Sequence, residues 1–131
     1  MIYEFSRSQM LLGSEAMEKL AKSSVILFGV GGVGSYCAEA LARTGVGKIC
    51  LVDGDKVALT NINRQLIATH KTLGMPKVLA AKERILDINP SCEVTVHECF
   101  YGPENEDNIN LSDYDYVIDA IDTVKSKVFL I

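Results

Sequence analysis

One glycine-rich turn constrains the fold of this chain more than any other feature of its sequence. A short apolar run, Val25–Phe28, leads into Gly29, Gly31 and Gly34, which have the spacing G-x-G-x-x-G. The run is partly β-branched, as is typical of a parallel strand covered on both faces. The three glycines permit a tight turn, a close approach of backbone N–H groups to a phosphate, and close packing of helix on strand, respectively. Gly32 weakens the helix start further, which favours a ligand close to the turn over a turn without one.

The residues after the turn strengthen the prediction of a nucleotide site. A helix is expected over about residues 33–43, with Gly45 as its left-handed cap, and a second strand is expected over 48–53. The start of the helix offers unpaired N–H donors and a partial positive charge to an anion. Asp53 ends the second strand, where a carboxylate can accept hydrogen bonds from ribose hydroxyls.

The remaining elements predict an α/β, Rossmann-like fold. We expect a helix over 76–88, a third strand over 93–98, an acidic loop over 100–113 with room for one helical turn, and a fourth strand over 115–122. Strand order 3-2-1-4 gives a mostly parallel sheet with helices on both faces and a crevice between the first and fourth strands. Residues 1–23 are expected to form a leader with a short helix over 15–22 that Ser14 caps. Because the chain ends soon after the fourth strand, the sheet is expected to be truncated there.

Composition narrows the classes of function. The formal net charge is -4, which provides no basic field for nucleic acid and weakens, without excluding, an RNA substrate. The cysteines contain no C-x-x-C pair, so we expect reduced thiols that pack as small apolar groups and no zinc site. His70 and His97 are expected to be structural or solvated. The sequence shows no signal peptide and no long apolar span, which predicts a cytoplasmic location and no membrane contact.

Several polar residues are expected to face the glycine turn across the crevice. They are Asn61, Arg64, Lys77 and Asp122. Two cations together with helix N–H groups suit a triphosphate, and a carboxylate at the end of the fourth strand suits a hard cation such as Mg²⁺. Nucleotidyl transfer needs these parts, because an attacking carboxylate and a polyphosphate are both anionic and their charge must be neutralised.

At these residues the sequence resembles the ubiquitin-activating-like adenylating enzymes of the ThiF/MoeB type. The resemblance implies that residues 24–131 are the N-terminal part of an ATP-binding adenylation domain. It spans nearly the whole chain and is more specific than the glycine motif alone. The matching segments are Gly29–Ser35, Thr44–Gly47, Leu51–Asp55, Asn61–Gln65, Gly74–Lys77 and Asp119–Asp122.

The resemblance also implies roles for individual residues. Asp53 is expected to hold the ribose, and Asp122 is expected to be the carboxylate linked to Mg²⁺. Arg7 matches a leader arginine that reaches the active site of the partner subunit in a homodimer. Asn61, Arg64 and Lys77 are expected to contact the ATP phosphates, and Arg64 and Lys77 are expected to stabilise the transition state as well. The full set expected to bind ATP is Gly29, Gly31, Gly32, Gly34, Asp53, Asn61, Arg64, Gln65 and Lys77.

A finer resemblance points to the tRNA threonylcarbamoyladenosine dehydratase branch of this family. The segments Tyr116–Val124 and Glu39–Gly45 are similar to that branch. Its members use ATP to activate the carboxylate of the threonylcarbamoyl group on a tRNA adenosine, and the activated group then cyclises with loss of water. No catalytic cysteine is required. The substrate-side strands, crossover loop and C-terminal region of the family are absent here, so this stretch alone is expected to be inactive.

Three other hypotheses remain open. The first keeps adenylation but makes the acceptor the C-terminal glycine of a ubiquitin-like sulfur-carrier protein, with a sulfur-transfer partner. The second is an NAD-dependent dehydrogenase, since Asp53 is equally suited to the ribose of NAD. The group Asn61, Arg64 and Lys77 argues against it, because a dehydrogenase has no use for triphosphate contacts there. The third is a nucleotide-binding or dimerising module without turnover.

Overall fold

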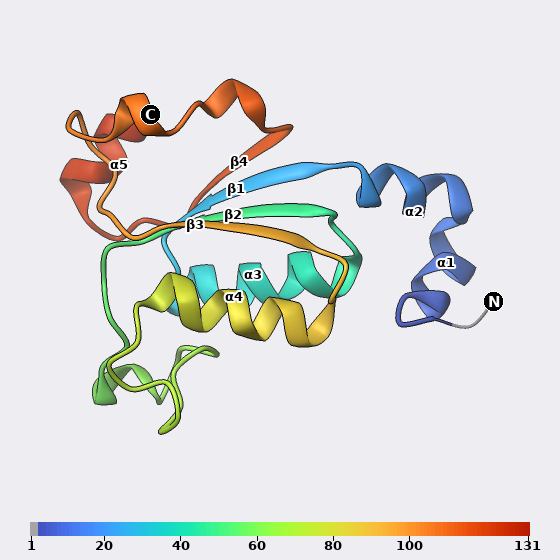
Figure 1. Ribbon diagram of the computed structural model, residues 1–131, viewed down its shortest axis with the longest axis horizontal. Coiled ribbons are helices and arrows are strands. Elements are labelled where there is room, and N and C mark those ends of the chain that lie inside the picture. The colour runs from blue at the N-terminus through green and yellow to red at the C-terminus, as the bar shows by residue number, and fades with distance from the viewer. Residues whose placement is uncertain (1–2) are drawn as a thin grey trace.

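A four-stranded parallel sheet forms the centre of the computed structural model, which describes residues 3–131. Its strands are β1 (Ser24–Phe28), β2 (Lys48–Val52), β3 (Glu93–His97) and β4 (Tyr116–Asp119). They lie in the order β3-β2-β1-β4, and every neighbouring pair is parallel, which confirms the predicted order (Figure 1). All four carboxyl ends therefore meet at one edge of the sheet, with the crevice between β1 and β4 as expected.

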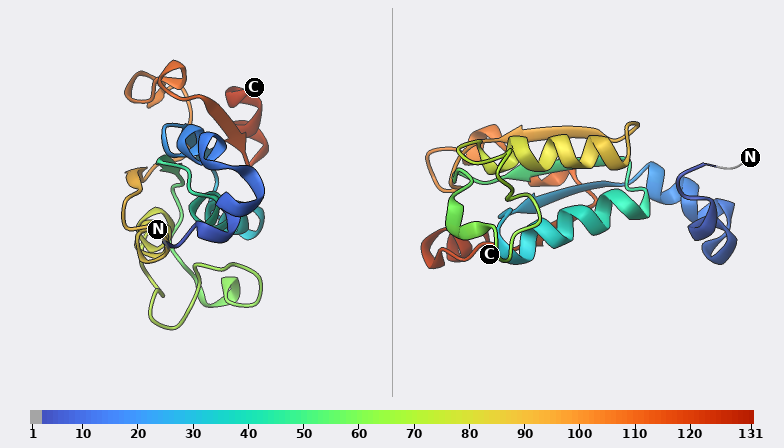
Figure 2. Two further views of the ribbon diagram at one scale, coloured as in Figure 1. Left: turned by 90° about the vertical axis from the view of Figure 1, so that its right-hand side faces the viewer. Right: turned by 90° about the horizontal axis from the view of Figure 1, so that it is seen from below.

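Two long helices cover one face of this sheet (Figures 1 and 2). They are α3 (Gly32–Thr44) and α4 (Lys77–Ile88). The alanines Ala38 and Ala42 are small enough to bring α3 close to the strands, and Ile85 of α4 is buried in the same core. Gly45 ends α3 with φ 92°, the left-handed cap that the sequence predicts. Each fully buried aliphatic side chain in this layer stabilises the fold by about 1.5–3 kcal/mol.

The opposite face is covered by the segment 98–115 and by α5 (Val124–Leu130). Phe28 of β1 packs on Tyr101, whose ring in turn contacts Phe129 of α5, with ring centroids 4.8 and 5.3 Å apart. The loop holds two short 3₁₀ turns, Glu106–Asn108 and Leu111–Asp113, where the sequence predicts one helical turn. The expectation of helices on both faces is confirmed.

The N-terminal segment differs from its prediction. Two helices, α1 (Ser6–Leu12) and α2 (Ser14–Ala21), lie beyond the amino ends of the strands (Figure 1). The sequence predicts only the second, because the apolar residues of α1, Met10, Leu11 and Leu12, are consecutive rather than at helical spacing, and all three are exposed. Ser14 is the first residue of α2 rather than its cap, and Gly13 precedes it without a side-chain cap. Residues 1–2 of the predicted leader lie outside the described residues.

The fourth strand is shorter than the sequence predicts. β4 ends at Asp119, earlier than the predicted end of the strand, because the Ile121 N–H donates to Asp119 Oδ1 and turns the chain.

Within residues 3–131, no helix has the length and apolar character needed to cross a membrane.

Candidate functional site

A pocket of about 240 Å³ opens at the carboxyl edge of the sheet. Its walls come from the glycine turn, the end of β2, the segment around residue 64, the start of α4 and the turn after β4. The structure thus brings together most of the predicted site residues from distant parts of the chain. The polar side chains that line the pocket are Asp53, Asp55, Arg64, Gln65, Lys77 and Asp122.

The glycine turn forms one wall of this pocket with its backbone. Gly29 has φ 94°, and a Cβ there would overlap the carbonyl of Ala120. A Cβ at Gly34 would overlap the carbonyl oxygen of Gly29, so Gly34 serves helix packing, as predicted, and does not line the pocket. Gly31 and Gly32 do line it, and a Cβ at Gly32 would meet no atom within 4 Å. The space beside Gly32 is therefore open to a ligand, whereas the side chain of Gln65 lies within contact distance of Gly31.

Asp53 ties the two turns of the pocket together. Its Oδ2 accepts the Val30 N–H at 2.7 Å, and its Oδ1 accepts the Asp55 N–H at 2.8 Å. The carboxylate therefore fixes the glycine turn to the end of β2. Each oxygen retains a further lone pair, which leaves room for a hydrogen bond from a ribose hydroxyl. That contact stays a prediction.

Arg64 and Gln65 form the side of the pocket that faces the glycine turn. The exposed guanidinium of Arg64 donates to the Thr60 carbonyl at 2.9 Å and to Asn63 Oδ1 at 3.1 Å. The side chain of Gln65 is buried, and its Oε1 has no hydrogen-bond partner among the described residues. An unsatisfied buried acceptor costs about 1–3 kcal/mol. A donor group on a ligand in the pocket would satisfy it.

Lys77 is a buried cation at the first residue of α4. It is only 6% exposed, and its Nζ lies 3.9 Å from Asp55 Oδ2. Burying an ammonium group is costly unless an opposite charge compensates it. The sequence patterns do not single out Asp55. The signal that could have found it is its position two residues after Asp53, at the end of a strand.

The turn after β4 presents Asp122 to the pocket. Asp122 is exposed, and the turn is fixed by an ion pair of 2.9 Å between Lys127 of α5 and Asp119. Burial alone would raise the pKa of Asp119, but hydrogen bonds from Lys127 and from the Ile121 backbone lower it below its usual value. The ion pair therefore persists at neutral pH and holds the turn to α5.

A smaller compartment of about 40 Å³ adjoins the pocket and shares Gly29, Asp53, Asp55 and Asp122 with it. Val52 and Phe100 line it, and neither is in the predicted site. A Cβ at Gly54 would come within 2.5 Å of the Phe100 ring, so glycine lets the ring lie against the turn after β2. The loop that carries Phe100 shows no periodicity, which is why the residue escapes prediction from sequence.

Three predicted site residues lie outside the pocket, namely Gly34, Asn61 and Arg7. Asn61 is buried, and its Oδ1 accepts the Ala58 N–H at 2.8 Å, which closes the turn before the pocket. Arg7 is exposed on α1, at the end of the sheet opposite the pocket (Figure 1). Arg7 cannot act on the pocket of its own chain from there. The roles expected for Asn61 and Arg7 stay predictions.

No preformed metal cluster is found in the part of the chain that the structure describes. Across residues 3–131, no three His, Cys, Asp or Glu side chains converge to hold an ion. A divalent cation bound near Asp122 would therefore need ligands from a bound molecule as well.

Burial raises the pKa of Cys92 to about 11, which keeps this thiol protonated and unreactive.

Comparison with known proteins places the chain in context. The ThiF family model matches residues 5–131. A tRNA threonylcarbamoyladenosine dehydratase of Bacillus subtilis is 52% identical over 130 residues, which are 99% of this chain and 51% of that protein. An adenylyltransferase and sulfurtransferase of Culex quinquefasciatus is 37% identical over 131 residues, which are 98% of this chain and 30% of that protein.

Solved structures agree with this likeness. Crystal structures of the E. coli tRNA N6-threonylcarbamoyladenosine dehydratase in complex with AMP and with ATP match with TM-scores of 0.92 and 0.90. The identities are 45% and 44%, and the matches cover 97% and 98% of this chain but only 52% and 53% of the solved chains. The chain thus spans about half the length of the dehydratases that it matches.

Proposed function

The chain belongs to the ThiF family, and from this premise we propose that it provides the nucleotide half of an enzyme that uses ATP to adenylate a carboxylate. The observation that carries the proposal is the pocket itself, in which Arg64 and Lys77 face the backbone of Gly31 and Gly32. A dehydrogenase binds a diphosphate and has no triphosphate to contact at this place. A triphosphate needs both cations, because its charge must be neutralised before an anionic carboxylate can attack.

The pocket supports a particular placement of ATP. We propose that the phosphates lie over Gly31 and Gly32 between Arg64 and Lys77, and that Asp53 holds the ribose. The base then lies over the opening of the smaller compartment beside Phe100, which is too small to enclose it. Charge-assisted hydrogen bonds from Arg64 and Lys77 strengthen as negative charge builds on the α-phosphate and the leaving pyrophosphate.

A magnesium ion fits this arrangement. The pocket is lined by three carboxylates, Asp53, Asp55 and Asp122, against two cationic side chains, so a triphosphate there needs further positive charge. Mg²⁺ is commonly bound by one or two carboxylates together with phosphate oxygens. We propose that Asp122 supplies the protein ligand. When bound, the ion neutralises charge on the phosphates.

We propose that the acceptor is the threonylcarbamoyl group of a modified tRNA adenosine. Its carboxylate attacks the α-phosphate of ATP and displaces pyrophosphate, and the resulting acyl adenylate cyclises by intramolecular attack and releases AMP. The proposal is supported by 52% identity to a dehydratase of this kind, against 37% to an adenylyltransferase and sulfurtransferase. The reaction requires no catalytic cysteine, and a cytoplasmic location follows from the tRNA substrate.

A homodimer completes the proposed site. Because α1 holds Arg7 far from the pocket of its own chain, we propose that this arginine serves the pocket of a second copy. The alternative acceptor, the C-terminal glycine of a ubiquitin-like sulfur-carrier protein, predicts a sulfur-transfer partner as well. That partner and that acceptor are supported only by the weaker likeness to the sulfurtransferase.

The acceptor is tested by mass spectrometry of tRNA from cells that lack the gene encoding this chain. The proposal predicts that the cyclised, dehydrated nucleoside disappears and that threonylcarbamoyladenosine accumulates. Unchanged tRNA, together with ATP–pyrophosphate exchange that depends on a sulfur-carrier protein, would move the assignment to the alternative acceptor.

A further inference from the structure

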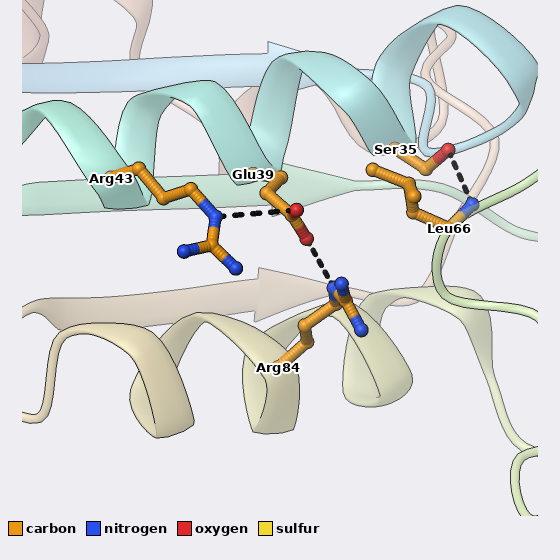
Figure 3. A network of polar contacts seen from close by, with 5 residues as sticks. All are labelled: Ser35, Glu39, Arg43, Leu66 and Arg84. Atoms are coloured by element: carbon orange, nitrogen blue, oxygen red, sulfur yellow. Dashed lines mark hydrogen bonds and ion pairs between the residues drawn. The ribbon is translucent and has the colours of Figure 1, made fainter.

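A single buried hydroxyl connects the glycine turn to the segment that carries Arg64 and Gln65. Ser35 lies in the first turn of α3, directly after the glycines, and is 1% exposed. Its Oγ accepts the N–H of Leu66 at 3.2 Å, across 31 residues of sequence (Figure 3). Leu66 follows Gln65 immediately, so this hydrogen bond lies next to the pocket wall.

The segment needs such a connection because it has little regular structure of its own. Between β2 and α4 the chain forms one short 3₁₀ turn, Leu59–Asn61, one isolated antiparallel bridge between Lys56 and Pro76, and otherwise turns and irregular backbone. The hydrogen bonds of Arg64 go to Thr60 and Asn63, within the same segment. They fix the shape of the segment, but they do not fix its distance from the glycine turn.

Apolar contacts hold the segment against the core without setting that distance. Ile67 and Ala68 are buried with the α3 and α4 residues of the main core. Apolar packing is non-directional, whereas a hydrogen bond specifies distance and angle. The Nε2 of Gln65 lies 3.6 Å from the position of a Cβ at Gly31, which shows how closely the segment approaches the turn. The Ser35–Leu66 bond is the directional contact beside that approach.

We infer that Ser35 is a positioning residue of the nucleotide site, which sets the separation between Arg64 and the glycine turn. Ser35 does not line the pocket, so it acts through the segment rather than on the ligand. The expected effect of Ser35 on ATP binding rests on the proposed function, whereas the hydrogen bond between Ser35 and Leu66 does not. Alanine at this position removes only the hydroxyl group and leaves the Leu66 N–H without its acceptor.

The test compares Ser35→Ala with wild type in the complete protein. Amide exchange at Leu66, measured by hydrogen–deuterium exchange, reports the contact directly and needs no ligand. Equilibrium dialysis with labelled ATP reports its consequence. We expect faster exchange at Leu66 and an ATP dissociation constant raised about two- to tenfold, the range that corresponds to one net hydrogen bond. In an Arg64→Ala background the same change should have a smaller effect, because coupled residues are not additive.

Ser23→Ala is the matched control. It removes a hydroxyl that donates to the Lys19 carbonyl at 2.7 Å, just before β1 at the amino end of the sheet, and should alter neither readout. Faster exchange at Leu66 with unchanged ATP affinity would overturn the inference, as would an equal loss of affinity with and without Arg64. Failure of the wild-type protein to bind ATP would instead refute the proposed function, and unchanged Leu66 exchange in the variant would then overturn the contact separately.

Discussion

Replacing Lys77 by methionine should separate ATP binding from stability. Methionine matches the length of the lysine stem and carries no charge. The ammonium of Lys77 is 3.9 Å from Asp55 Oδ2, at the end of a side chain that is 8% exposed. At that separation the attraction is about 4 kcal/mol for an effective dielectric constant of about 20. Asp55 is 58% exposed, so solvent screening reduces this value.

The cost of burying the ammonium offsets this attraction. Desolvation of one buried ion amounts to several kcal/mol after relaxation, and replacing buried ion pairs by apolar groups is often neutral or stabilising. Lys77→Met should therefore change the free energy of unfolding by less than about 1 kcal/mol. A charge-assisted hydrogen bond to a phosphate contributes about 1.5–3 kcal/mol, so ATP affinity should fall roughly 10- to 150-fold.

Urea denaturation and ATP titration calorimetry on the complete protein measure the two quantities. Lys82→Met is the matched control, since Lys82 lies on the same helix and does not line the pocket. It should leave the affinity unchanged. Wild-type affinity in Lys77→Met, or a loss of affinity explained by unfolding alone, would refute the proposed phosphate contact.

Three further changes test other parts of the account. Arg64→Ala should abolish ATP-dependent activation of the acceptor while circular dichroism remains that of the wild type; unchanged turnover would exclude its role. Mixing Arg7→Ala subunits with Asp122→Ala subunits should restore part of the activity if Arg7 acts across a dimer, and no recovery would count against a shared site. Glu39→Gln should lower the free energy of unfolding by about 1 kcal/mol near neutral pH, because the hydrogen bond from Arg84, aided by Arg43, lowers the pKa of Glu39 (Figure 3). That stabilisation is present above the usual pKa of 4.5 and is lost as the pH falls through the lower folded-state value. Equal denaturant midpoints for Glu39→Gln and the wild type at neutral pH would contradict the prediction.

Much of the fold can be predicted from the sequence because its signals are local. The apolar runs and the glycine spacing predict the parallel strands and their order, and Gly45 has the left-handed cap expected of it. α1 cannot be predicted in this way, since its apolar residues, Met10, Leu11 and Leu12, follow one another and do not recur at helical spacing. The end of β4 is also hidden, because it depends on the Asp119 side chain accepting a hydrogen bond from the backbone N–H of Ile121.

The site is predictable where charge or glycine marks it, and not where it depends on distant contacts. Arg64 and Lys77 stand out because cations facing a phosphate turn have few other uses. Asp55, Phe100 and Ser35 do not stand out, since their importance comes from neighbours far away in the sequence. Asn61 is the opposite case, since the sequence predicts it as a site residue but the structure does not place it in the pocket. Its side chain closes a local turn through Ala58 instead.

The central claim is that the pocket holds a reacting ATP. It is tested most directly by incubating the purified complete protein with ATP, Mg²⁺ and tRNA that carries threonylcarbamoyladenosine, followed by mass spectrometry of the nucleosides. The account predicts loss of one water from the modified adenosine, with one AMP and one pyrophosphate formed for each conversion. Unaltered nucleoside and no AMP, in a preparation shown to be folded, would contradict it.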